Sequence, residues 1–271
     1  MEGFTQAASS FCFFLALGSL GSVGARVVPR TQGLQAPSAT AQQPARSELT
    51  PEQRGDIFMA RKSYADAVDY YMRALRQEHS HEAAAIIWNK TGISLQQEDQ
   101  YLAARKAYKK ALGLNPDLSE AWNNLGTTFF LQNKFSKSVK YYDHAIALDP
   151  SSASFHVNLG TSYTRMKKFG QAVDEYRAAL TLDPTILAAH STSGTVVQPR
   201  HVDADYFFYM AKVFASLGRT PEAVSYLRRA FEEGFKNMKQ LDQDPDFLKI
   251  SKDSDYLALR NSPPVAIPGT D

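Results

Sequence analysis

The chain repeats itself at a period of 34 residues, and this period constrains the fold more than any other feature. Three units that follow one another without a gap, each containing Asn-Pro or Asp-Pro near its end, are 85–118, 119–152 and 153–186. The small residues that recur in every unit are Gly92, Gly126 and Gly160, and Ala111, Ala145 and Ala179. Residues 48–81 carry the pattern once more, three residues out of phase. A fixed period of this length predicts one supersecondary unit stacked on copies of itself.

Each unit is predicted to form two helices. In residues 119–152, apolar side chains recur every three or four positions in two stretches separated by the turn at 132–134. Pro150 ends the second stretch because proline cannot continue a helix. Gly126 and Ala145 are small where the helices must approach closely, and we expect larger residues there to clash.

The order Trp, Leu-Gly, Tyr, Ala, aromatic, Ala and Pro within each unit resembles the tetratricopeptide repeat. The resemblance covers residues 48–186 in four repeats, and residues 204–236 look like a fifth, divergent repeat. Departures from the family pattern are His156 for Trp, His79 for Pro and Arg54 for Leu. The resemblance implies an all-α, right-handed solenoid of helix-turn-helix repeats whose first helices line a concave groove. It looks like a repeat protein of the bacterial exported type.

The repeats are flanked by segments of different composition. Residues 187–203, between the fourth and fifth repeats, predict an inserted loop with a short extended pair around Gly194, either functional or inert. Residues 237–261 predict two short capping helices, and 262–271 predict a tail. The apolar residues expected to cover the last repeat are Phe247, Leu248, Tyr256 and Leu257.

The N-terminal residues predict export. Residues 11–23 are apolar over the length of a signal-peptide core and are followed by small residues up to Ala25. We therefore expect a signal peptide over residues 1–25, a disordered linker over 26–47 and a periplasmic protein that meets a membrane only transiently. The stretch before the apolar run has no basic residue, which leaves an uncleaved anchor or a cytoplasmic protein as alternatives.

Charge and cysteine content argue against several functional classes. The 30 basic and 28 acidic residues are mixed along the same predicted helices, without the basic stripe of a nucleic-acid-binding protein. Cys12 is the only cysteine, so the repeats have no disulfide and no thiolate metal site. His79 and His81 are two positions apart, and such positions do not share a helix face. The sequence shows no phosphate-binding loop or nucleophile motif. We predict no nucleic-acid partner, no cofactor, no metal and no catalytic residue.

The expected binding surface is the concave face of the first helices. Asparagine carries a donor and an acceptor, so a row of asparagines can bond the backbone of an extended peptide. Asparagine is also frequent at these family positions, which is the simpler explanation. The predicted partner-binding residues are Asn89, Lys90, Asn123, Asn124, Thr127, Asn158, Thr161 and Arg165, with Tyr209 from the aromatic run 206–209. The sequence thus predicts a non-catalytic scaffold for a protein or peptide ligand. The alternative is a substrate-presenting or assembly module for a partner enzyme or envelope complex.

Export gives the first testable prediction. The mature chain should begin at or near Arg26, because the apolar run ends in a small-residue cleavage site at Ala25. Mass spectrometry of the protein from its native host measures this N-terminus, and an intact Met1 would contradict the prediction.

Overall fold

The computed structural model describes residues 48–187 and 203–266, which belong to one compact unit. The predicted signal peptide, the linker and residues 188–202 of the predicted insertion, including Gly194, lie outside the described residues. Within these two ranges the regular structure is helical, without a strand.

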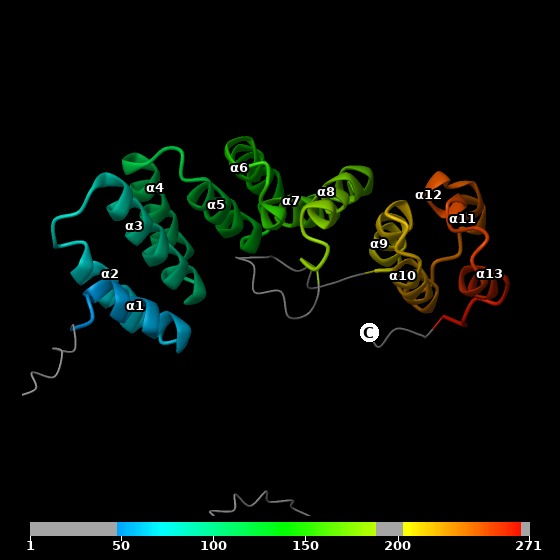
Figure 1. The fold of residues 1–271 in the computed structure, drawn as a ribbon, viewed down its shortest axis with the longest axis horizontal. Coiled ribbons are helices and arrows are strands. Elements are labelled where there is room, and N and C mark those ends of the chain that lie inside the picture. The colour runs from blue at the N-terminus through cyan, green and yellow to red at the C-terminus, as the bar shows by residue number, and fades with distance from the viewer. Residues whose placement is uncertain (1–47, 188–202, 267–271) are drawn as a thin grey trace, which may run out of the picture. The chain divides into compact units, whose positions relative to one another are not determined.

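The helices form consecutive antiparallel pairs that follow one another along the chain (Figure 1). The paired helices are α1 (Pro51–Ala60) with α2 (Tyr64–Ala74), α3 (His81–Gln97) with α4 (Tyr101–Leu114), α5 (Ser119–Leu131) with α6 (Phe135–Leu148), α7 (Ala153–Arg165) with α8 (Phe169–Leu182), and α9 (Ala204–Ser216) with α10 (Thr220–Glu232). The second helix of each of the first four pairs also packs on the first helix of the next pair. The predicted all-α solenoid of helix-turn-helix repeats is confirmed.

Within each of the first four pairs, a tyrosine of the second helix packs on a glycine of the first. The tyrosine ring is buried in every case, and the four rings belong to Tyr71, Tyr108, Tyr142 and Tyr176. A Cβ atom added to Gly92 would lie 2.4 Å from Cε1 of Tyr108, and one added to Gly126 would lie 2.8 Å from Cε1 of Tyr142. These distances are too short for a real contact, so glycine is required for the helices to approach this closely.

The turns inside the first four pairs share one unusual backbone conformation. Lys62, Asp99, Asn133 and Lys167 have φ between 56° and 59°, the left-handed region that few non-glycine residues adopt. The amide that follows each of them donates to a carbonyl of the preceding helix, as Lys134 N does to Phe129 O at 2.9 Å. The turn predicted at 132–134 is therefore one hydrogen-bonded reversal that recurs in each repeat.

The C-terminal cap consists of three short helices where the sequence predicted two. They are α11 (Met238–Gln243), α12 (Pro245–Leu248) and α13 (Ser254–Asn261). Phe247 and Tyr256 are buried as predicted, but the prediction for Leu248 and Leu257 is wrong, because 56% and 39% of these residues are exposed. Short helices cannot bury adjacent residues on one face, so Leu241, Ile250 and Leu259 from other turns complete the core.

Ion pairs fix this cap to the repeats. Asp246 on α12 lies 3.4 Å from Lys212 Nζ of α9 and 3.5 Å from Arg177 Nη2 of α8. Desolvation opposes the charge of Asp246, but the bond to Lys249 and the charges of the neighbouring lysines outweigh it and lower its pKa. A largely buried carboxylate with three cations around it holds α12 at a defined place on α8 and α9.

Glycine substitutions test the tyrosine contacts. Gly92→Ala should destabilise the protein by about 2–3 kcal/mol, because Tyr108 cannot move away from the new methyl group without disturbing the core. The loss of stability should be smaller for Gly126→Ala. It should be smaller again for Gly160→Ala, because the nearest ring atom there is 3.2 Å from the added Cβ. Gly113→Ala is the control, since its Cβ would meet nothing within 4 Å, and it should stabilise by up to about 1 kcal/mol. Thermal unfolding followed by circular dichroism gives the order, and equal effects at Gly92 and Gly113 would contradict it.

Candidate functional site

The asparagines predicted to face a partner are buried in the repeats. Asn123, Asn124 and Asn158 expose 3%, 4% and 0% of their surface, and Asn89 is also buried. They lie on the first helices α3, α5 and α7, where the sequence placed them. These side chains therefore pack within the repeats, and their predicted contact with a partner stays a prediction.

Their amide groups form a continuous chain of hydrogen bonds across three repeats. Asn158 Nδ2 donates to Asn123 Oδ1 at 2.8 Å, and Asn124 Nδ2 donates to Asn89 Oδ1 at 3.1 Å. Asn123 Nδ2 connects the two by donating to Asn124 Oδ1 at 3.3 Å. We call these four residues the asparagine seam. It joins α3 to α5 and α5 to α7, because neighbouring first helices bring residues 35 apart into contact.

The two predicted threonines also bond within the repeats. Thr127 Oγ1 lies 3.1 Å from the hydroxyl of Tyr142, and Thr161 Oγ1 lies 3.1 Å from that of Tyr176. Burial raises the pKa of both tyrosines, so these hydroxyls stay protonated. The threonines thereby satisfy the polar end of the ring that packs on the repeat glycine.

Lys90 and Arg165 are held by other helices. Lys90 Nζ lies 2.8 Å from Glu52 and 2.9 Å from Asp56, both on α1. Burial alone would lower the pKa of Lys90, but these two carboxylates outweigh it and raise the pKa. Arg165 lies over the ring of Phe135, 4.8 Å from its centroid. Both cations contribute to contacts between helices.

The aromatic run at 206–209 splits between two environments. Phe207 and Phe208 are buried, whereas Tyr206 and Tyr209 are half-buried. The ring of Tyr209 stacks on Phe169 of α8 with centroids 4.5 Å apart. Tyr209 therefore connects the fourth and fifth helix pairs, and its predicted partner contact stays a prediction.

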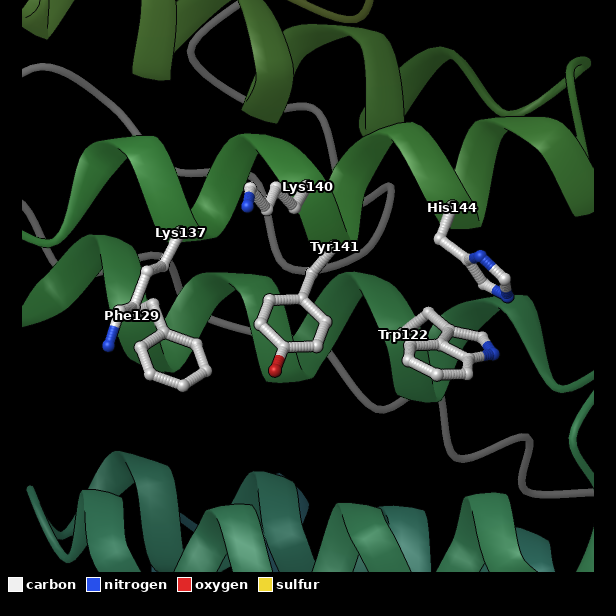
Figure 2. A pocket seen from close by; sticks show the side chains of 6 residues that line it. All are labelled: Trp122, Phe129, Lys137, Lys140, Tyr141 and His144. Atoms are coloured by element: carbon white, nitrogen blue, oxygen red, sulfur yellow. The ribbon is translucent and has the colours of Figure 1, made fainter.

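An open pocket, which the sequence reasoning missed, lies on α5 and α6. It measures about 430 Å³ and is lined by Trp122, Phe129, Lys137, Lys140, Tyr141 and His144. We call it the aromatic pocket. Figure 2 shows the rings of Phe129, Tyr141 and Trp122 in a row, with Lys137 at one end and His144 at the other.

The rings of the pocket hold one another in place. Phe129 and Tyr141 stack with centroids 5.1 Å apart and planes 2° from parallel. Trp122 lies 6.1 Å from Tyr141 and 4.2 Å from His144, and its Nε1 donates to the carbonyl of Pro116 at 2.8 Å. The three large rings are only half-buried, although they also pack on the core of α3, α4 and α5. Trp122 and Phe129 belong to the apolar side chains that recur at helical spacing in residues 119–152, and such spacing predicts packing and not an open surface. The available signal was the run of Lys137, Lys140, Tyr141 and His144 at helical spacing on α6.

The corresponding place in the next repeat is occupied differently. His156 and Glu175 stand 34 residues after Trp122 and Tyr141, and His156 Nδ1 lies 2.7 Å from Glu175 Oε2. The bond to Glu175 raises the pKa of His156 against the opposing effect of burial. Desolvation and the charge of Glu175 raise the pKa of Asp143 on α6.

The described residues hold no group of three His, Cys, Asp or Glu side chains that could bind a metal ion. Every buried side-chain nitrogen or oxygen in the described ranges has a hydrogen-bond partner. The helices in these ranges include none long and apolar enough to cross a membrane. The chemistry left accessible around the aromatic pocket is that of ring faces and cations, which suits binding.

Sequence profiles of the tetratricopeptide repeat match three consecutive stretches. One profile matches residues 85–118 and 153–186, and a second matches residues 119–152. Residues 85–186 of this chain are tetratricopeptide repeats. Repeats of this family are protein–protein interaction modules, so the same description applies to the repeat array here. No curated protein matches the sequence.

Solved structures with a similar helical arrangement include two of the protein MamA. One MamA structure is 20% identical with a TM-score of 0.46, and the match covers 66% of this chain and 93% of that one. MamA from Desulfovibrio magneticus RS-1 is 16% identical with a TM-score of 0.47, covering 72% and 95%. YrrB, described as a tetratricopeptide-repeat protein with an unusual peptide-binding site, is 18% identical with a TM-score of 0.44, covering 71% and 89%.

The asparagine seam predicts that substitution of its residues lowers stability, whereas substitution on an open binding surface would leave stability unchanged. Asn158→Ala should destabilise the protein by roughly 1–3 kcal/mol, because it leaves the buried Oδ1 of Asn123 without its donor. In a double-mutant cycle, Asn123 and Asn158 should couple by on the order of 1 kcal/mol. Asn158 and Asn237, which caps α11 and shares no hydrogen bond with the seam, serve as the control pair and should be nearly additive. Urea unfolding measures all variants, and a stable Asn158→Ala protein would contradict the structural role.

Proposed function

We propose that the chain is a non-catalytic scaffold that binds a segment of another protein, and that the aromatic pocket receives an apolar side chain of that segment. The observation that carries this proposal is the row of three large rings left half-exposed on α5 and α6. Buried aromatic contacts dominate the binding energy of protein interfaces, with tryptophan and tyrosine prominent among them.

The pocket is ordered before a partner arrives. Stacking fixes Tyr141 against Phe129, and the hydrogen bond to Pro116 O fixes the ring of Trp122. Binding then loses little side-chain entropy, so more of the contact energy appears as affinity. The seam and the tyrosine–glycine contacts add to this by holding the supporting helices rigid.

The face of the first helices is the second candidate surface, in keeping with the groove predicted from the sequence. Ile86 on α3 is 44% exposed, and Glu120, at the same repeat position on α5, is also exposed. A partner on this face would contact such residues and not the seam beneath them. This surface offers no comparable cluster of half-exposed rings among its predicted residues, which is why we favour the aromatic pocket.

A scaffold of this kind would serve as an assembly factor or present substrates to a partner enzyme. We place it outside the cytosol, a proposal that rests on the apolar residues 11–23 alone. The identity of the partner tests the proposed role, and the mature N-terminus tests the proposed location.

Site-specific crosslinking tests the proposed surface. A photoreactive amino acid is introduced at position 141, in the aromatic pocket, or at position 86, on the face of the first helices. We expect crosslinks to a discrete partner protein from position 141 in native cells, because that side chain would contact the bound segment. Position 252, at the exposed Lys252 of the C-terminal region, is the control and should give none. Crosslinks from position 86 alone would move the site to the first helices.

A further inference from the structure

We infer that the segment bound at the aromatic pocket is acidic, carrying Asp or Glu residues on either side of one apolar side chain. This inference rests on the proposed function and names the chemistry of the partner. It derives from two lysines that line the pocket and two cations on the neighbouring helix α4, none of which has a carboxylate partner among the described residues, and from the loss of these cations in the next repeat.

Two neighbouring second helices supply the cations. Lys137 and Lys140 of α6 line the pocket directly. Arg105 of α4 lies over the ring of Phe129, with its Cζ 5.1 Å from the centroid. Lys109 stands four residues after Arg105, so it lies one helical turn further along the same face of α4. The pocket thus has basic residues on both of its sides.

No carboxylate of the described residues neutralises these cations, although Arg105 Nη1 donates to Oε1 of Gln132 at 3.0 Å. Within the described ranges, none of the four forms an ion pair, although cations elsewhere in the repeats do, such as Lys90 and Arg177. Helix α4 carries four basic residues and no acidic one, so the mixing of basic and acidic residues predicted along the helices does not hold for α4. Cations near an apolar surface attract carboxylates more strongly than fully solvated ones, because the local dielectric constant is lower.

The next repeat provides a comparison on the same backbone. The residues 34 positions after Arg105, Lys109, Lys137, Lys140, Tyr141 and His144 are Val139, Asp143, Gln171, Asp174, Glu175 and Ala178. Every one of the four Lys and Arg side chains is lost and three carboxylates appear. In that repeat, the His156–Glu175 pair stands where Trp122 and Tyr141 stand in the aromatic pocket. The basic aromatic pocket is therefore a property of these side chains and not a consequence of the repeat fold.

The same reversal favours a short peptide over other polyanions. A nucleic-acid strand or an anionic bilayer would extend past α6 and meet Asp143, Asp174 and Glu175. Asp174 is paired with Arg177 and Glu175 with His156, so these positions offer a phosphate group no net positive charge, whereas a short acidic segment can end before it reaches them. Half-exposed rings at the centre of the pocket call for an apolar side chain, which a protein segment supplies and an inorganic anion does not.

Tryptophan fluorescence measures the binding directly. The chain has two tryptophans, so Trp88→Phe leaves Trp122 as the reporter inside the pocket. The probe is a synthetic nine-residue peptide of alternating Asp and Glu around one central Leu. Three control peptides replace the acidic residues by Asn and Gln, replace them by Lys, or replace the central Leu by Ser. The whole chain is titrated with each peptide at low and high ionic strength.

We expect the acidic Leu peptide to bind at least about tenfold more tightly than the neutral Leu peptide, and the difference to shrink as salt screens the charges. Lys137→Glu with Lys140→Glu should weaken the acidic peptide by about tenfold or more, since two attractive charges become repulsive. Lys239→Glu with Lys252→Glu, at two exposed positions in the C-terminal region, changes the net charge equally and should leave its affinity within about twofold.

Each result that differs from these expected affinities would overturn a different part of the proposal. Equal affinity for the acidic and neutral Leu peptides would overturn the acidic partner and leave the apolar pocket standing. Equal affinity for the Leu and Ser acidic peptides would overturn the role of the pocket, and with it the proposed function. Tighter binding of a single-stranded oligonucleotide or of anionic phospholipid vesicles than of the acidic Leu peptide would overturn the choice of a protein segment.

Discussion

The packing of a buried tyrosine on a glycine sets the distance between the two helices of each of the first four repeats. The added Cβ at Gly92 would lie only 2.4 Å from the ring of Tyr108, so no other residue allows the observed approach. The tyrosine hydroxyl then needs a polar partner, which Thr127, Thr161 or Gln96 of the first helix provides. One contact thus fixes both the separation of a helix pair and the polar residues that must stand beneath it.

The asparagine seam fixes the position of one repeat relative to the next, as the tyrosine–glycine contact fixes the two helices within a repeat. Buried amides are costly unless every donor and acceptor is used, and a chain of amide bonds allows only one arrangement of α3, α5 and α7. The seam therefore specifies how neighbouring repeats stack, while the alanines and tyrosines supply most of the apolar burial. Side chains committed to this register are not available to a ligand without loss of stability.

The surface residues that take no part in the tyrosine–glycine contacts or the asparagine seam differ from repeat to repeat. These residues are the best candidates for contacts with a partner. At the aromatic pocket, rings that pack on the core also remain open, and Lys137 and Lys140, which form no ion pair with another described residue, stand beside them. One repeat later the same backbone carries an ion pair between His156 and Glu175. Protein–protein interaction is the property of the repeat family, and the identity of a partner depends on such differences between its copies.

The sequence alone determined the helical period, the helix pairs and the close contact at Gly126, because these depend on spacing within one 34-residue unit. It also located Asn124 and Asn158 on the first helices. Only the tertiary structure decided what those amides bond, because their partners lie 35 residues away and depend on how two repeats stack. The sequence likewise did not predict that the ring of Trp122 is half-exposed. A tryptophan on a packing face is closed or open according to the side chains of the neighbouring second helices, and periodicity carries no information about that contact.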